Sequence, residues 1–154
     1  RYSLDSDPLQ KTTFAEELRA LELYLHIEKA RFQDRLKLEI DVDPKARRAM
    51  APSLLLQPAV ENAIKYSIAK RTEGGALRLK AHVREGRLFL AVCDDGPGLP
   101  GDPMKTLRDC AGVGFANMRD RLIHLYGEDH SFVIRNLAPK GFAVEIDIPF
   151  EEDA

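Results

Sequence analysis

Two adjacent carboxylates, Asp94 and Asp95, lead directly into the turn Gly96-Pro97-Gly98. They follow an apolar run, residues 88–93, that predicts a strand buried on both faces. Glycine adopts backbone angles closed to other residues and leaves room for a ligand beside the main chain, while Pro97 fixes one dihedral angle. The segment is therefore a candidate floor for a ligand, and an ordinary Asp-Gly surface turn is the alternative.

A second set of polar residues lies in a predicted helix that runs from about Leu54 to Ile68. Glu61, Asn62 and Lys65 place an acid, an amide and an amine within about one turn of one another. Asparagine is a mediocre helix former, so a Glu-Asn pair on the buried side of a helix indicates a requirement other than helix stability. The alternative is a solvated ion pair between Glu61 and Lys65, worth a few tenths of a kcal/mol.

A glycine pair comes immediately before the last predicted helix, which ends at Gly127. Gly112-Val113-Gly114 would expose the first amides of that helix, and these amides together with the helix dipole attract phosphate. A helix cap is the alternative for this short motif. Residues 99–111 lack any clear period, and a loop of this length inside a compact domain is usually functional or disordered.

The remaining elements must hold these three groups together. Thr13 and Glu16 predict the capped start of a helix that ends near Gln33, and residues 36–42 alternate as a half-buried strand. The other predicted strands are residues 77–84 and 88–93, which form a hairpin, 132–137, and 142–148. This order predicts a two-layer α/β sandwich, in which a mixed, largely antiparallel five-stranded sheet carries about three helices on one face. The polar helix, the Asp94 strand end and the glycine-led helix could then line one pocket under the long loop.

Composition limits the class of protein. The 154 residues include 23 basic and 25 acidic side chains, which suits one compact domain and gives no electrostatic basis for binding nucleic acid. Two cysteines, Cys93 and Cys110, are too few for a disulfide framework and favour a reducing, cytoplasmic setting. The chain begins at Arg1 without an initiator methionine, which indicates a fragment. The missing part could contain a membrane anchor or a sensor.

Three segments resemble, in this order, the nucleotide-binding boxes of the GHKL ATPase superfamily. Residues 61–66 look like the N box, residues 94–98 like the G1 box, and residues 112–115 with Asn117 like the G2 box. The flanking segments 24–32, 52–58 and 117–122 look most like the catalytic part of LytS-like sensor histidine kinases. The resemblance covers residues 12–150 and implies the Bergerat ATP-binding fold. Residues 1–11 then resemble a lead-in from the helical, histidine-bearing region upstream, and residues 151–154 form a tail.

The resemblance implies a role for each matching residue. Asp94 would accept a hydrogen bond from the exocyclic amine of adenine, Asn62 would ligate Mg²⁺ through its amide oxygen, and Glu61 would act as the catalytic base. The remaining residues implied to bind ATP are Lys65, Tyr66, Gly96, Gly98, Gly112, Val113, Gly114 and Asn117. Arg119 and Arg121 are weaker candidates, for which solvated helix arginines are the alternative.

The implied protein is a two-component sensor histidine kinase that takes ATP and Mg²⁺. Its partners would be the upstream histidine-bearing dimerisation helices of the same protein, which implies a homodimeric parent, and a cytoplasmic response regulator. The alternatives are a GHKL ATPase that drives a conformational clamp, a protein-serine kinase, and a non-catalytic nucleotide-sensing module.

The sequence also departs from the family pattern. None of its histidines, which are His26, His82, His124 and His130, has the Asn-Pro-His-Phe context of the phosphoacceptor. The acceptor therefore lies outside this fragment. Tyr66-Ser67 replaces the more usual His-Gly, and Asp95 stands where Asn is common. Neither departure removes a proposed ligand.

Overall fold

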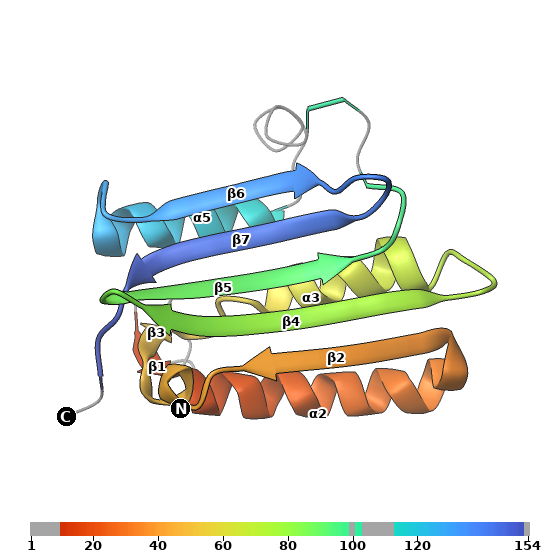
Figure 1. Cartoon of the computed structure of the whole chain (residues 1–154), viewed down its shortest axis with the longest axis horizontal. Coiled ribbons are helices and arrows are strands. Elements are labelled where there is room, and N and C mark those ends of the chain that lie inside the picture. The colour runs from red at the N-terminus through yellow and green to blue at the C-terminus, as the bar shows by residue number, and fades with distance from the viewer. Residues whose placement is uncertain (1–9, 99–100, 103–112, 153–154) are drawn as a thin grey trace.

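The computed structural model describes residues 10–98, 101–102 and 113–152. Its main sheet has five strands in the order β2-β4-β5-β7-β6 (Figure 1). The strands are β2 (Leu36–Val42), β4 (Gly75–Arg84), β5 (Arg87–Asp94), β6 (Ser131–Asn136) and β7 (Phe142–Pro149). Only β2 and β4 pair in parallel, and every other neighbouring pair in this sheet is antiparallel. The predicted mixed, largely antiparallel sheet is confirmed.

Three helices lie on one face of this sheet: α2 (Phe14–Phe32), α3 (Gln57–Ala63) and α5 (Val113–Tyr126) (Figure 1). Thr13 accepts a hydrogen bond from the amide of Glu16, as the capping pattern predicts. The buried side chains of the helices and of the inner sheet face form one core, which includes Phe14, Leu25 and Leu90. Burying this apolar surface is the main force that holds the two layers together. The predicted α/β sandwich is confirmed.

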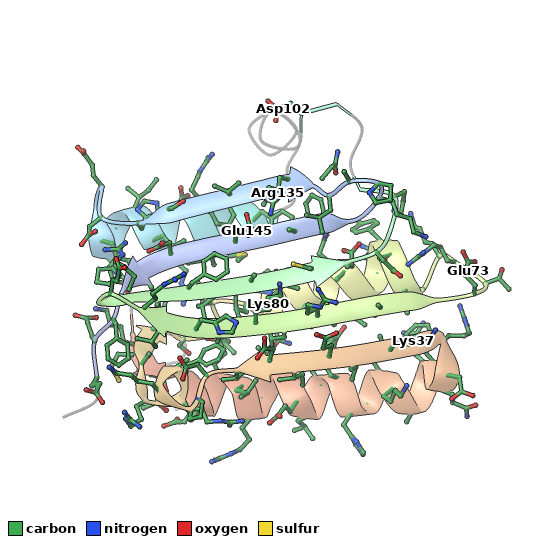
Figure 2. The ribbon with its side chains drawn as sticks, viewed as in Figure 1. Lys37, Glu73, Lys80, Asp102, Arg135 and Glu145 are labelled. Atoms are coloured by element: carbon green, nitrogen blue, oxygen red, sulfur yellow. The ribbon has the colours of Figure 1, made fainter. Side chains whose placement is uncertain are left out.

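The second face of the sheet is open, and this corrects the expectation for β5. Leu88, Leu90 and Val92 are buried against the helices, whereas Phe89 and Cys93 on the opposite face are only half-buried. Lys80, Arg135 and Glu145 lie on the open face (Figure 2). The alternation of a strand therefore places Asp94, two residues after Val92, on the helix-covered side.

The polar helix begins later than its sequence predicts. Leu54 has a φ of 57°, which interrupts the helix, so that α3 starts at Gln57 with Pro58 in its first turn. From Ile64 to Ile68 the chain continues as a π-helix, η3. Such wide turns are often found at functional sites, and this one contains Lys65, Tyr66 and Ser67.

Both ends of the described chain contact the same short segment. β1 (Lys11–Thr13) pairs with β3 (Met50–Pro52). Met50 donates its amide to the carbonyl oxygen of Glu151, and Arg48 forms a 3.0 Å ion pair with Glu152. Residues 151–152 are therefore attached to residues 48–50.

Two short 3₁₀ segments, η1 (Gln33–Arg35) and η2 (Pro44–Arg48), flank β2. Glu85 and Gly86 both have positive φ angles, 51° and 77°, as a two-residue hairpin turn between β4 and β5 requires. In the described part of the chain, no helix combines the length and the apolar character of a membrane span.

Candidate functional site

Asp94 is the last residue of β5 and one of few buried acidic side chains in the described chain, with 9% of its surface exposed. Its Oδ1 atom accepts a 2.8 Å hydrogen bond from the amide of Gly96, and the Ser67 hydroxyl lies close to the same carboxylate. Burial raises the pKa of Asp94, and the Gly96 amide and the Ser67 hydroxyl oppose that rise. A carboxylate held in this way is a directed acceptor beside the inner face of the sheet.

The two glycines after Asp94 are required by close packing. A Cβ at Gly96 would lie 2.6 Å from Oγ of Ser67, and one at Gly98 would lie 2.2 Å from Oδ1 of Asn136. Gly98 also has a φ of 78°, which disfavours other residues. The turn can therefore keep its position beside Asp94 only without side chains, as the sequence indicates.

An arginine without a predicted role connects Asp95 to the π-helix. Nη2 of Arg71 lies 2.5 Å from Oδ1 of Asp95 and 3.1 Å from Oγ of Ser67, and Nε donates to the Ser67 carbonyl at 2.9 Å. Oδ1 of Asp95 also accepts the amide of Ala76 at 3.0 Å. Although burial raises the pKa of Asp95, the bonds from Ala76 and Arg71 outweigh burial and lower it. The four-residue spacing of Ser67 and Arg71 is the sequence signal for this contact.

The start of α5 lies beside the same strand end. Asp94 is paired in register with Phe142 of β7, and the Phe142 ring stacks on that of Phe115, with centroids 6.4 Å apart. Phe115 belongs to the first turn of α5, which begins at Val113. The Asp94 strand end and the α5 start therefore converge. Gly112 and most of the predicted covering loop, 99–111, lie outside the described residues, as do the side-chain surroundings of Val113 and Gly114.

The polar residues of α3 and η3 occupy the third side, since α3 contacts both β5 and α5. Asn62 is half-buried, and Glu61 is exposed, which corrects the expectation that both face inward. Oε2 of Glu61 accepts a 2.8 Å hydrogen bond from Nε2 of Gln57. Tyr66 is 47% exposed, and Nζ of Lys65 lies 5.1 Å from the centroid of its ring. This side therefore offers oxygen donors and an amine to solvent.

The oxygen donors of α3 suit a hard cation. The carboxylate of Glu61 and the amide oxygen of Asn62 are adjacent in sequence, and Mg²⁺ prefers oxygen ligands. Asn62 is the better protein ligand by position, since the Glu61 carboxylate is already hydrogen-bonded to Gln57. Mg²⁺ commonly takes only one or two protein ligands when it also binds phosphates, so a single amide fits this role.

Farther along α5, Asn117 is exposed, Arg119 is half-exposed, and Arg121 turns inward. Arg121 donates a hydrogen bond to the carbonyl of Ser53, in the turn before α3, so it is not the solvated arginine that the sequence favours. Burial lowers its pKa and a nearby acid, Glu17, raises it. Glu17 lies inside the apolar stripe of α2, a signal from which its structural role could have been predicted.

Comparison with known proteins identifies the chain's relatives. Residues 48–152 match the family described as histidine kinase-, DNA gyrase B-, and HSP90-like ATPases. The chain is 34% identical over 137 residues to the sensor histidine kinase YesM of Bacillus subtilis, covering 89% of this chain and 24% of YesM. It is 30% identical over 146 residues to the sensor protein LytS of Enterococcus faecalis, covering 90% of this chain and 25% of LytS. The chain thus spans about a quarter of the length of these relatives.

Solved structures of low sequence identity share the fold. The catalytic domain of the histidine kinase ThkA superposes with a TM-score of 0.70 at 14% identity, over 94% of this chain and 98% of that one. The histidine kinase domain of the blue-light activated kinase from Erythrobacter litoralis gives a TM-score of 0.67 at 23% identity, over 89% of this chain and 61% of that one.

Proposed function

Because the chain belongs to the family of histidine kinase-, DNA gyrase B-, and HSP90-like ATPases, we propose that it is the ATP-binding catalytic domain of a two-component sensor histidine kinase. The observation that carries this proposal is the convergence of three segments on one end of the sheet. Ser67 of η3 lies against the Gly96 turn that follows Asp94 of β5, and Phe142, the register partner of Asp94, stacks on Phe115 of α5.

Adenine recognition is assigned to Asp94. Its carboxylate accepts hydrogen bonds from the chain on one side, and a carboxylate has further lone pairs that can accept the exocyclic amine of adenine. Guanine has an oxygen at that position and would face the carboxylate without a proton to donate. Gly96 and Gly98 leave the turn bare, so that a base can approach the backbone.

The phosphates are assigned to the other two sides of the site. Lys65 lies on η3, and the amides of Val113 and Gly114 at the start of α5 would bind the phosphate oxygens. The amide of Gly112, the preceding residue in the sequence, is assigned the same role. Tyr66 and Asn117 complete the proposed nucleotide contacts. Asn62 would hold Mg²⁺, which supplies charge neutralisation at the phosphates when bound.

Transfer of the γ-phosphoryl group is assigned to Glu61. A histidine nitrogen attacks the γ-phosphorus in line, the bond to the β-phosphate oxygen breaks, and ADP leaves. The exposed carboxylate of Glu61 takes the imidazole proton or orients the ring. Because none of the chain's four histidines has the acceptor context, the acceptor lies upstream in a homodimeric parent, which passes the phosphoryl group to a response regulator. The domain acts in the cytoplasm, and a membrane anchor, where the parent has one, belongs to the rest of the protein.

A transfer assay tests this function. The 154-residue chain is incubated with γ-labelled Mg-ATP, alone and with a polypeptide that carries the parent's upstream histidine segment. We expect negligible labelling of the chain and acid-labile labelling of the polypeptide, which a His-to-Ala copy of the polypeptide loses. Strong acid-labile self-labelling would contradict an upstream acceptor. Nucleotide binding without any transfer would instead indicate a nucleotide-sensing module.

Substitution of Asp94 tests the adenine assignment separately. Asp94→Asn removes the charge that strengthens the hydrogen bond to the base, so the affinity for Mg-ATP should fall about 10-fold to 100-fold. Asp41→Asn is the matched control, because Asp41 lies on β2 beside His82, with a separation of 3.5 Å, away from the site. Equal affinities of the Asp94→Asn variant and the unaltered chain for Mg-ATP would remove the assignment.

A further inference from the structure

Arg71 joins two segments of the proposed nucleotide site that are far apart in sequence. Its guanidinium donates to Oδ1 of Asp95, to Oγ of Ser67 and to the Ser67 carbonyl, at 2.5, 3.1 and 2.9 Å. Its side chain is only 17% exposed, and the Arg71 carbonyl accepts a 2.9 Å bond from Arg35. The arginine is therefore fixed at both its backbone and its guanidinium.

The bond from Arg71 determines how the Ser67 hydroxyl is used. A hydroxyl has one proton, and the guanidinium can only donate, so Oγ of Ser67 is the acceptor in this contact. The proton of Ser67 is thereby left for another acceptor, and Asp94 lies near it. The position of a Cβ at Gly96 is 2.6 Å from Oγ of Ser67 and 3.0 Å from Oδ1 of Asp94. Without the arginine, a helical serine can turn its proton to a backbone carbonyl one turn earlier and release Asp94.

Two glycines leave the space that the side chains of Arg71 and Ser67 occupy. A Cβ at Gly75 would lie 1.9 Å from Nη2 of Arg71, and one at Gly96 would lie 2.6 Å from Oγ of Ser67. Arg71 also supplies positive charge beside two consecutive carboxylates, Asp94 and Asp95, which repel each other. Ser67 and Asp95 both accept hydrogen bonds from this one arginine. Both residues are among the positions where the sequence departs from the family pattern.

We propose that Arg71 is a positioning residue for adenine recognition, which acts through the Ser67 hydroxyl to hold the Asp94 carboxylate toward the base. This inference rests on the proposed function, because it requires that Asp94 accepts the adenine amine. Arg71 makes the site selective for a base that carries an amine at position 6, without contacting the nucleotide itself.

Two nucleotides that differ at that position, and in the proton on the adjacent ring nitrogen N1, test the proposal. Mg-ATP has an amine there and Mg-ITP has an oxygen, so affinities for both are measured by titration calorimetry with the 154-residue chain. We expect Arg71→Gln to weaken Mg-ATP about tenfold and to leave Mg-ITP within about twofold, since one charge-assisted contact is worth about this much. Ser67→Ala should lower the ATP-to-ITP ratio by a similar factor.

The double variant tests the route of action. If Arg71 acts through Ser67, Arg71→Gln combined with Ser67→Ala should lower the ratio no further than either change alone, because the two residues form one pathway. Arg78→Gln is the matched control. Arg78 forms a 3.2 Å ion pair with Glu39 between β4 and β2, and its loss should leave both affinities unchanged.

Two results would overturn the proposal. Equal weakening of Mg-ATP and Mg-ITP by Arg71→Gln would show a general structural role, and no change in either affinity would show no role at the site. If circular dichroism shows that Arg71→Gln does not fold, the affinities of Ser67→Ala and Arg71→Lys for Mg-ATP and Mg-ITP are compared instead. If Asp94→Asn leaves Mg-ATP affinity unchanged, the adenine assignment of the proposed function fails, whatever the Arg71 variants do.

Discussion

The backbone amide of Leu56 donates a 2.5 Å hydrogen bond to Oε2 of Glu17, a buried acid of α2 that lies 39 residues earlier in the chain. Leu56 is the residue immediately before α3, and its side chain cannot cap the helix. The carboxylate of Glu17 therefore supplies the acceptor that the Leu56 amide needs. Oε1 of Glu17 is buried and has no hydrogen-bond partner among the described residues. The start of α3, and with it Glu61 and Asn62, is therefore held by an acid inside the core.

Folding stability should depend on pH through Glu17. Burial raises its pKa from 4.5 to about 7, against the lowering effect of its backbone hydrogen bonds. Between these values the folded chain keeps a proton that the unfolded chain has lost, so the free energy of unfolding falls as pH rises through this window. The total fall due to Glu17 is about 3 kcal/mol, from about 1.4 kcal/mol per unit of pKa. Glu17→Gln should remove this part of the pH dependence.

Urea unfolding between pH 4.5 and pH 8 measures the effect of Glu17. The difference in unfolding free energy between the unaltered chain and Glu17→Gln should shift by about 3 kcal/mol in favour of the variant as pH rises. Glu22→Gln, at an exposed residue of α2 away from the helix cap, is the control for the loss of one carboxylate. A constant difference for Glu17→Gln would show that folding leaves the pKa of this acid unchanged.

The sheet and its helices could be predicted because their patterns are local. Helical spacing after Thr13 depends on neighbours only a few positions apart, and that helix forms as expected. β5 likewise forms where the apolar run 88–93 predicts a strand, although helices cover only one of its faces. The late start of α3 could not be predicted in this way. It depends on the positive φ of Leu54 and on a carboxylate from α2, and no local rule contains either contact.

The candidate site divides in the same manner. Asp94, Gly96 and Gly98 could be selected from the sequence because their types and spacing are unusual within a single segment. Arg71 could not be selected in this way, because its role arises from a contact with Asp95, 24 positions away, together with one to Ser67, four positions earlier. One-sided exposure of the sheet likewise follows from the absence of helices on its second face in the described structure, and not from the composition of β5.

Gly96→Ala should damage the site by steric contact. The added Cβ would lie 2.6 Å from Oγ and 2.9 Å from Cβ of Ser67, so the turn must shift away from η3. We expect a loss of about 1–3 kcal/mol in unfolding free energy, and a loss of Mg-ATP affinity. Ser67→Gly removes the atoms that clash, so Gly96→Ala should cost less unfolding free energy in a Ser67→Gly background than in the unaltered chain. An equal cost in the two backgrounds would show that the damage has another cause.

The two adjacent aspartates should titrate in opposite directions from an ordinary aspartate. Burial raises the pKa of Asp94, whereas hydrogen bonds from Ala76 and Arg71 lower that of Asp95 in spite of its burial. Asp95 thus adds stability that is lost as pH falls through its folded pKa, and Asp94 opposes folding once pH rises above its own. Carboxyl-carbon NMR of the free chain measures both values, and Arg71→Gln should raise both. A lower pKa for Asp94 than for Asp95 would refute the described contacts.

Glu61→Gln should separate binding from transfer. The glutamine keeps the size of the side chain and can still contact Gln57, but it cannot take a proton from the acceptor imidazole. We expect Mg-ATP affinity within about twofold of the unaltered chain, and transfer to the histidine polypeptide slower by about 100-fold or more, the usual contribution of a general base. Glu22→Gln, an exposed acid on α2, is the control for the loss of one charge. Undiminished transfer by Glu61→Gln would assign the base to another group, and a parallel loss of Mg-ATP affinity would assign Glu61 to nucleotide binding instead.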